Sequence, residues 1–99
     1  SSVQKQKLKI TKITSPKAKT ILLKWKKATG TNGYQIQYAT NSKFTRRRKT
    51  VIIKNRSTVS KTIKKLKRKK TYYVRIRAYR KLKGRTYFSK WSSKKIRCK

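Results

Sequence analysis

Two tyrosines and two arginines alternate along one stretch of the chain and are the residues best suited to bind a ligand. Tyr73, Arg75, Arg77 and Tyr79 are each separated by one residue, so an extended strand places all four on one face. Guanidinium groups bind phosphate or sulfate through paired hydrogen bonds, and aromatic rings stack on nucleic-acid bases. The run Arg46-Arg47-Arg48-Lys49 could add to this surface. The expected partners are polyanions, meaning nucleic acid, sulfated glycan, or anionic proteins and surfaces.

The same alternation also has a purely structural explanation. It is typical of a strand with one buried and one solvated side, where an outward tyrosine packs against its cross-strand neighbours. Both interpretations remain open from the sequence. A second group of cations, between Lys61 and Lys70, contains no aromatic residue and indicates a charged strand end and loop.

The composition argues against most kinds of catalysis. The 99 residues include 34 Lys and Arg but no Asp, Glu or His, which gives a formal net charge of +34. General acid–base catalysis, hard-metal binding and glycoside hydrolysis depend on carboxylates or histidine. We therefore expect a protein that is not an enzyme and that has no cofactor and no metal site.

Cys98 is the only cysteine, so an internal disulfide cannot form. A disulfide-linked dimer through Cys98 is one expectation, and a packed or merely exposed thiol is the other.

A surface charged with one sign has two general consequences. Its self-repulsion destabilises the folded state more strongly as salt is diluted. It also binds nucleic acid and other polyanions without specificity. Ordinary domains mix both signs of charge, so the complete absence of acidic residues indicates selection or design.

Apolar residues recur at every second position in several segments, which predicts strands and no long helix. The segments begin at Leu8 to Ile10 and continue at 21–25, 34–38, 51–53, 59–63, 72–79 and 87–98. Turn residues separate them, with Gly84 expected at positive φ in a hairpin and Gly30 and Gly33 expected in loops. Seven short strands in one domain of residues 1–99 predict an all-β, antiparallel β-sandwich.

The alternation turns large apolar and aromatic side chains inward, and the expected core therefore includes Trp25, Tyr34, Ile36, Tyr72, Val74 and Ile76. No run reaches the roughly eighteen apolar residues needed to cross a bilayer. The N-terminal residues also lack the apolar core of a signal peptide.

Nearly the whole chain resembles the fibronectin type III domain, an immunoglobulin-like sandwich, and in particular the repeats of bacterial cell-surface and secreted proteins. The resemblance rests on Ile21-Leu22-Leu23-Lys24-Trp25, on Gly33 to Tyr38, and on Leu66 followed six residues later by Tyr72, as in the family's tyrosine corner. It extends through Thr71 to Tyr79 and the segment Tyr87 to Ser92, and it implies that Leu66 and Trp91 also belong to the core. It implies an extracellular or cell-surface location and a structural or adhesive role.

Amides stand where members of this family commonly carry acids. Gln35 occupies a position that is often Glu and Asn41 one that is often Asp, and Gln4, Gln6, Gln37 and Asn55 look like further replacements. The sequence therefore predicts a non-catalytic structural or adhesion-type module in an engineered, positively supercharged form that associates with polyanions by electrostatics. The alternative is a dedicated binder of nucleic acid or sulfated glycan through the basic and aromatic sheet face.

Overall fold

The computed structural model describes residues 5–99 and contains eight β-strands. Their bounds are β1 Ile10–Thr14, β2 Ile21–Trp25, β3 Gly33–Ala39, β4 Lys49–Ile53, β5 Ser60–Ile63, β6 Thr71–Leu82, β7 Arg85–Phe88 and β8 Ser92–Arg97. Among the described residues, no helix is long and apolar enough to cross a membrane.

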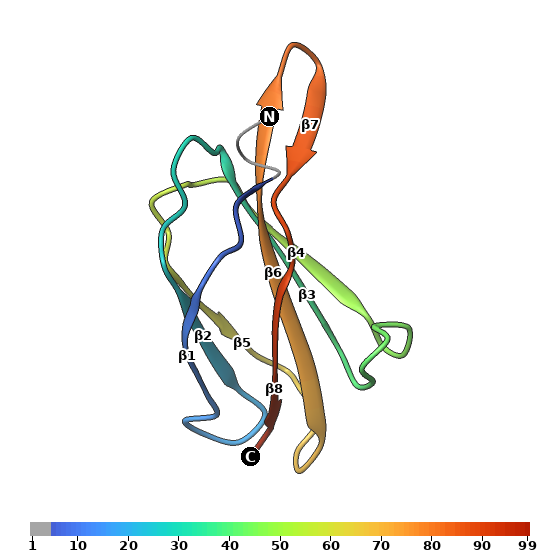
Figure 1. The fold of residues 1–99 in the computed structure, drawn as a ribbon. Helices are drawn as coiled ribbons and strands as arrows, with labels where there is room; N and C mark the ends of the chain where they lie inside the picture. Colours follow the sequence, from blue (N-terminus) through green and yellow to red (C-terminus); the bar gives the residue numbers. More distant parts are fainter. Residues whose placement is uncertain (1–4) are drawn as a thin grey trace.

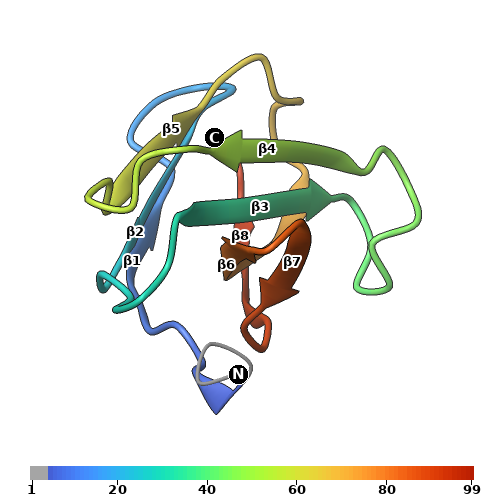
Figure 2. The same cartoon turned by 90° about the horizontal axis from the view of Figure 1, so that it is seen from above.

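The strands form two antiparallel sheets packed face to face. One sheet has the order β1-β2-β5, and the other has the order β4-β3-β6-β7 with β8 also paired to β6. Figure 1 shows β6 running the length of the molecule, with β7 beside its upper part and β8 beside its lower part. Figure 2 shows the two layers from above, with β3 and β4 in one and β1, β2 and β5 in the other. The predicted antiparallel sandwich is confirmed.

The core between the sheets follows from the period-two pattern. Tyr34 and Ile36 on β3 and Val74 and Ile76 on β6 are fully enclosed, and Trp25 closes one end with its ring at 62° to that of Tyr34. Seven of the eight side chains expected in the core are buried. The eighth, Trp91, is not part of the core and is described with the candidate site.

The predicted tyrosine corner is present. The Tyr72 hydroxyl accepts a hydrogen bond of 2.8 Å from the Lys67 backbone N–H, and Leu66 beside it is buried. This bond ties the loop between β5 and β6 to the start of β6.

The structure has eight strands where we predicted seven, because the expected strand 87–98 is interrupted. Phe88 of β7 pairs with Tyr79, whereas Ser92 of β8 pairs with Ile76. From Phe88 to Ser92 the chain advances four residues, whereas β6 advances only three between their partners Tyr79 and Ile76. The segment between β7 and β8 therefore carries one extra residue, a β-bulge. Ser89 closes the interruption, since its N–H donates to the Ala78 carbonyl and its hydroxyl accepts from the Ala78 N–H.

Gly84 in the β6–β7 turn and Gly33 on β3 have different roles. Gly84 lies at φ 78° beside Lys83 at φ 49°, so the predicted tight hairpin turn is confirmed. Gly33 was expected in a loop, and this prediction is wrong: it is the first residue of β3 and pairs with Tyr79. A Cβ at Gly33 would lie 2.9 Å from the Tyr79 hydroxyl oxygen and would also meet the Ile53 carbonyl, so only glycine fits beneath the ring.

Candidate polyanion-binding face

The outer face of the larger sheet carries five stacked side chains in which rings and guanidinium groups alternate. The Arg75 guanidinium carbon lies 4.2 Å from the centroid of the Phe44 ring and 4.2 Å from that of Trp91. The Arg77 guanidinium carbon lies 4.1 Å from Trp91 and 3.7 Å from Phe88. We call the series Phe44, Arg75, Trp91, Arg77, Phe88 the ladder. Each contact is within the range of a cation–π interaction.

Trp91 stands at the centre of the ladder, and its prediction as a core residue is wrong. Phe88 points outward opposite Tyr79, and Ser89 is buried. Simple alternation would therefore turn Trp91 inward as well. The extra residue of the bulge reverses the faces, because side chains alternate with a period of two. Trp91 is half-buried on the outer face, and Ser92 takes the inward position.

Phe44 enters the ladder from the loop between β3 and β4 in a backbone conformation that bulky residues rarely adopt, with φ 56°. The loop is held by Asn41, whose side-chain oxygen accepts from the N–H groups of Thr45 and Arg46 at 3.0 and 2.9 Å. The Phe44 ring is buried against Arg75. Packing on the guanidinium group thus offsets the backbone strain.

The edges of the two ladder arginines are held by amides of the neighbouring strand β3. The Gln37 Oε1 atom accepts from Arg75 Nε at 2.9 Å and from Nη2 at 2.5 Å, and the Gln35 Oε1 atom accepts from Arg77 Nε at 2.7 Å. Burial lowers the pKa of Arg75, and the positive charge of the nearby Arg48 lowers it further. Burial likewise lowers the pKa of Arg77, and the positive charge of Arg75 lowers it further. Both stay protonated at neutral pH, because the ordinary pKa of arginine lies far above neutrality.

The two predicted tyrosines lie on the same outer face but not in the ladder. Tyr73 is half-buried and pairs with Ala39 on one side and Lys95 on the other. Tyr79 was expected to be available to a ligand, and this is wrong: it is 7% exposed because its ring lies over Gly33.

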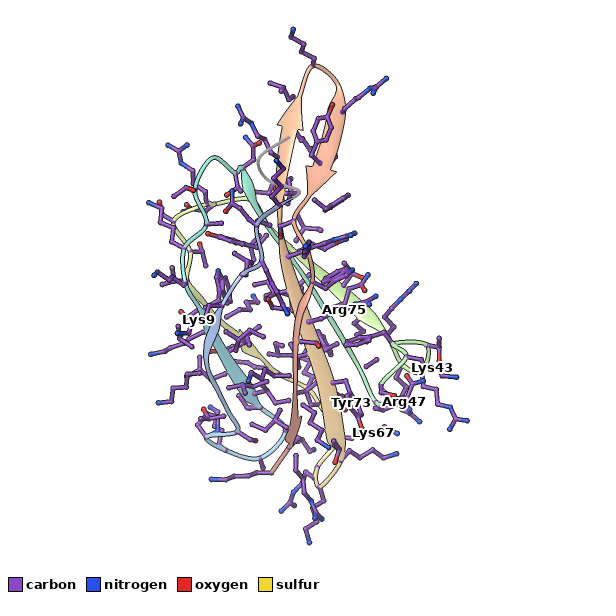
Figure 3. All side chains as sticks on the ribbon, in the orientation of Figure 1. Lys9, Lys43, Arg47, Lys67, Tyr73 and Arg75 are labelled. Atoms are coloured by element: carbon purple, nitrogen blue, oxygen red, sulfur yellow. The ribbon has the colours of Figure 1, made fainter. Side chains whose placement is uncertain are left out.

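The four predicted cations 46–49, at the end of the β3–β4 loop and the start of β4, do not join the ladder as a unit. Arg46 is exposed and its backbone carbonyl accepts from the Thr40 N–H at 3.1 Å. Arg47, Arg48 and Lys49 instead line a cavity with lysines of the β5–β6 loop. Figure 3 shows Arg47 and Lys67 on the same side of the molecule below Arg75, with Tyr73 beside Arg47 in this view.

This geometry restricts what the face can do. Both faces of each ladder guanidinium are covered by rings, and an amide oxygen occupies part of its hydrogen-bonding edge. The arginines therefore hold the outer face together, and phosphate can reach only the parts of the guanidinium edges that the two amides leave open. Reasoning from sequence missed Phe44 and Phe88 as their partners. Pairing Phe88 with Tyr79 across the hairpin turn would have pointed to Phe88, whereas no local signal points to Phe44.

The thiol of Cys98 is enclosed. Cys98 is 1% exposed, and its Sγ lies 4.0 Å from the Ser15 hydroxyl, which also accepts from the Lys99 N–H at 2.9 Å. The Cys98 N–H donates to the Lys70 carbonyl, and its own carbonyl accepts from the Lys69 N–H. A disulfide-linked dimer through Cys98 would require this chain end to detach. The packed thiol is the alternative that the structure favours.

The chain belongs to the fibronectin type III domain family, whose model matches residues 5–94. Its fold is similar to chicken CNTN1 FN1-FN3 domains, with a TM-score of 0.73, 18% identity, and coverage of 95% of this chain and 31% of that one. It is also similar to a structure from a computer-based redesign of a β-sandwich protein, with a TM-score of 0.75, 22% identity, and coverage of 94% of both chains. No curated protein matches the chain.

Domains of this family are in general structural modules without catalytic activity, and they are commonly extracellular. This chain spans about a third of the CNTN1 chain that it resembles.

We expect Gln37→Glu to stabilise the fold by about 1 kcal/mol, because it converts an amide contact with Arg75 into a charge-assisted bidentate pair. It also removes one unit of repulsion from a surface of net charge +34. Urea unfolding at physiological ionic strength measures the gain. Asn55→Asp is the matched control, since Asn55 is exposed and caps only the Ser57 N–H. Its expected gain is below about 0.5 kcal/mol, and equal gains for the two variants would contradict the ion-pair explanation.

Proposed function

We propose that this chain is a single, non-catalytic structural module, an engineered and positively supercharged variant of a bacterial cell-surface type fibronectin type III domain. Its parent belongs to the extracellular or cell-surface environment. Its association with polyanions is electrostatic and distributed over the whole surface.

The observation that carries this proposal is the pairing of the ladder arginines with amides. Gln35 and Gln37 direct a neutral oxygen at Arg77 and Arg75, where a carboxylate of the same shape would neutralise a partly buried charge. Asn41 accepts the two backbone N–H bonds of its loop as an aspartate would. Amides at positions that suit acids support the removal of acidic residues from an ordinary parent sequence. Gln4, expected to be another replacement, lies outside the described residues.

The ladder also bears on the alternative, a dedicated binder of nucleic acid or sulfated glycan through the basic and aromatic face. Such a site needs open aromatic faces for stacking and free guanidinium edges for phosphate. The guanidinium groups of Arg75 and Arg77 stack on the Trp91 ring instead, and Tyr79 is covered. Tyr73 is the remaining aromatic side chain of the predicted site that a base could reach.

The test compares loss of charge beside the ladder with loss of charge on the opposite sheet. Lys43→Gln with Lys95→Gln removes two exposed cations near Phe44 and Tyr73, and Lys12→Gln with Lys24→Gln removes an exposed pair from β1 and β2. Distributed binding predicts that both double variants weaken binding of labelled single-stranded DNA by the same factor, to within about twofold.

Tyr73→Ala completes the test, because it removes the accessible ring without changing the charge. We expect DNA affinity within about twofold of the parent, whereas loss of a stacked base would lower it roughly fivefold or more. Circular dichroism on the same samples establishes that each variant is folded. A large loss with Tyr73→Ala alone would replace the distributed interpretation with the dedicated site.

A further inference from the structure

The fold brings two separate basic segments together around one cavity at the open edge of the sandwich. The cavity has a volume of about 420 Å³. Arg47 and Arg48 line it from the end of the β3–β4 loop and Lys49 from the start of β4. Lys64, Lys65 and Lys67 line it from the β5–β6 loop. Six cations from segments far apart in the sequence thus converge on one hollow (Figure 3 labels Arg47 and Lys67).

Backbone contacts hold the two basic segments in place against their mutual repulsion. The Leu66 N–H donates to the Lys19 carbonyl at 3.1 Å, and the Lys67 N–H donates to the Tyr72 hydroxyl at 2.8 Å. Lys49 lies in β4 and pairs with Tyr38. Since the chain has no acidic side chain, none of its own side chains can neutralise the charge of this cluster, and an anion from outside can.

Two tyrosines add hydrogen-bonding groups to the cavity. Tyr38 and Tyr72 both line it. Burial raises the pKa of Tyr38, and the neighbouring Tyr72 raises it further. The Tyr38 phenol therefore keeps its proton at neutral pH, and its O–H can donate a hydrogen bond to a bound oxygen.

A second hollow of about 580 Å³ continues from this cavity along the edge between β4 and β5. Tyr38 and Lys64 line both, and Val51 and Ile63 give the second hollow an apolar part. One water molecule occupies about 30 Å³ in the liquid, so the first cavity alone has room for more than a single small ion. The shape suits an anionic group that is attached to a less polar body.

We propose that this cavity is a saturable site for a tetrahedral oxyanion ester, a phosphate or sulfate group whose attached body extends along the edge between β4 and β5. Cations from both loops surround the oxyanion, and Tyr38 donates to it. The site is distinct from the ladder face and from the distributed attraction of the whole surface.

The test is a titration of the isotopically labelled protein with sodium sulfate, and separately with inorganic phosphate, followed by amide chemical shifts. Sodium chloride keeps the total ionic strength near about 0.5 M, where the Debye length falls to roughly 4 Å and diffuse attraction is suppressed. We expect saturation with one shared Kd for the amides of 47–49 and 64–67. If both ions saturate the site, it accepts phosphate and sulfate esters alike. If only one ion saturates it, that ion identifies the ester. If neither ion saturates it, the proposed site is overturned.

Matched variants locate the binding. Lys49→Gln with Lys64→Gln removes one exposed cation from each wall of the cavity. We expect this double variant to raise the Kd of the bound ion about tenfold or more. Lys12→Gln with Lys24→Gln removes the same charge from the opposite sheet and should raise this Kd less than about twofold. Tyr38→Phe keeps the ring and should weaken binding about threefold. Equal losses for the two double variants would overturn the proposal, and the distributed DNA binding proposed above would be unaffected.

Discussion

The affinity of this domain for single-stranded DNA of about twelve nucleotides is expected to fall about a thousandfold as salt rises from about 50 mM to about 200 mM. The charge is distributed over the loops and over every strand except β3, and all the Lys side chains among residues 5–99 are exposed. A short strand can therefore contact about seven cations in many arrangements, and each contact releases counterions. In the distributed binding that we propose, the physical cause is this release, which salt opposes directly.

Fluorescence anisotropy at a series of salt concentrations measures this dependence, with circular dichroism on the same samples. A straight line of log Kd against log salt, with no residual binding at several times physiological ionic strength, is the expected result. A one-site complex that survives at that ionic strength with the fold intact would contradict distributed binding. Sodium glutamate in place of chloride tests the anion's part in the effect.

The sandwich could be predicted from the sequence because its main determinants are local. Alternation of apolar residues in 21–25, 34–38 and 72–79 fixes which side of each strand faces the core, and the strands appear there. Leu66 and Tyr72 mark the tyrosine corner through a fixed spacing, and Gly84 marks the hairpin through its positive φ. These signals need no knowledge of distant contacts.

The candidate site was predicted only in part because it depends on register. Arg75 and Arg77 were correctly placed on the outer face, but their partners come from a loop, a second strand and a bulge that are up to about 30 residues away along the chain. A bulge of one residue is invisible to a period-two pattern, and it changes the face on which Trp91 lies. Tyr79 was misjudged for a related reason, since its burial depends on its cross-strand pairing with Gly33.

The basic segments show the same limit. Arg47 to Lys49 and Lys64 to Lys67 are separate in the sequence, and the second group had no aromatic residue to mark it. Their convergence on one cavity follows from the edge positions of β4 and β5 in opposite sheets. Only tertiary structure places them together, so composition could predict attraction for anions but not a discrete hollow.

Trp91→Ala is expected to destabilise the fold by about 3 kcal/mol. Trp91 is the ring that separates the two ladder arginines, with each guanidinium carbon within 4.2 Å of its centroid. Its removal leaves two partly buried like charges facing a cavity without the ring between them. Urea unfolding measures the loss, and the experiment should use about 0.5 M sodium chloride so that screening of the remaining surface charge is constant. Guanidinium chloride is unsuitable because it is itself a salt.

Two further substitutions separate the ladder from ordinary aromatic burial. Tyr87→Ala removes another half-buried ring, that of Tyr87 on β7. No ladder arginine stacks on this ring, and we expect a loss of about 1 kcal/mol in the free energy of unfolding. Trp91→Phe keeps a ring between the arginines and should recover more than half of the stability lost in Trp91→Ala. If Trp91→Ala were no more harmful than Tyr87→Ala, the stacked cations would contribute nothing beyond contact area. The outer face of this sheet would then be free to evolve or be redesigned for binding, because its arginines would not be needed for the fold.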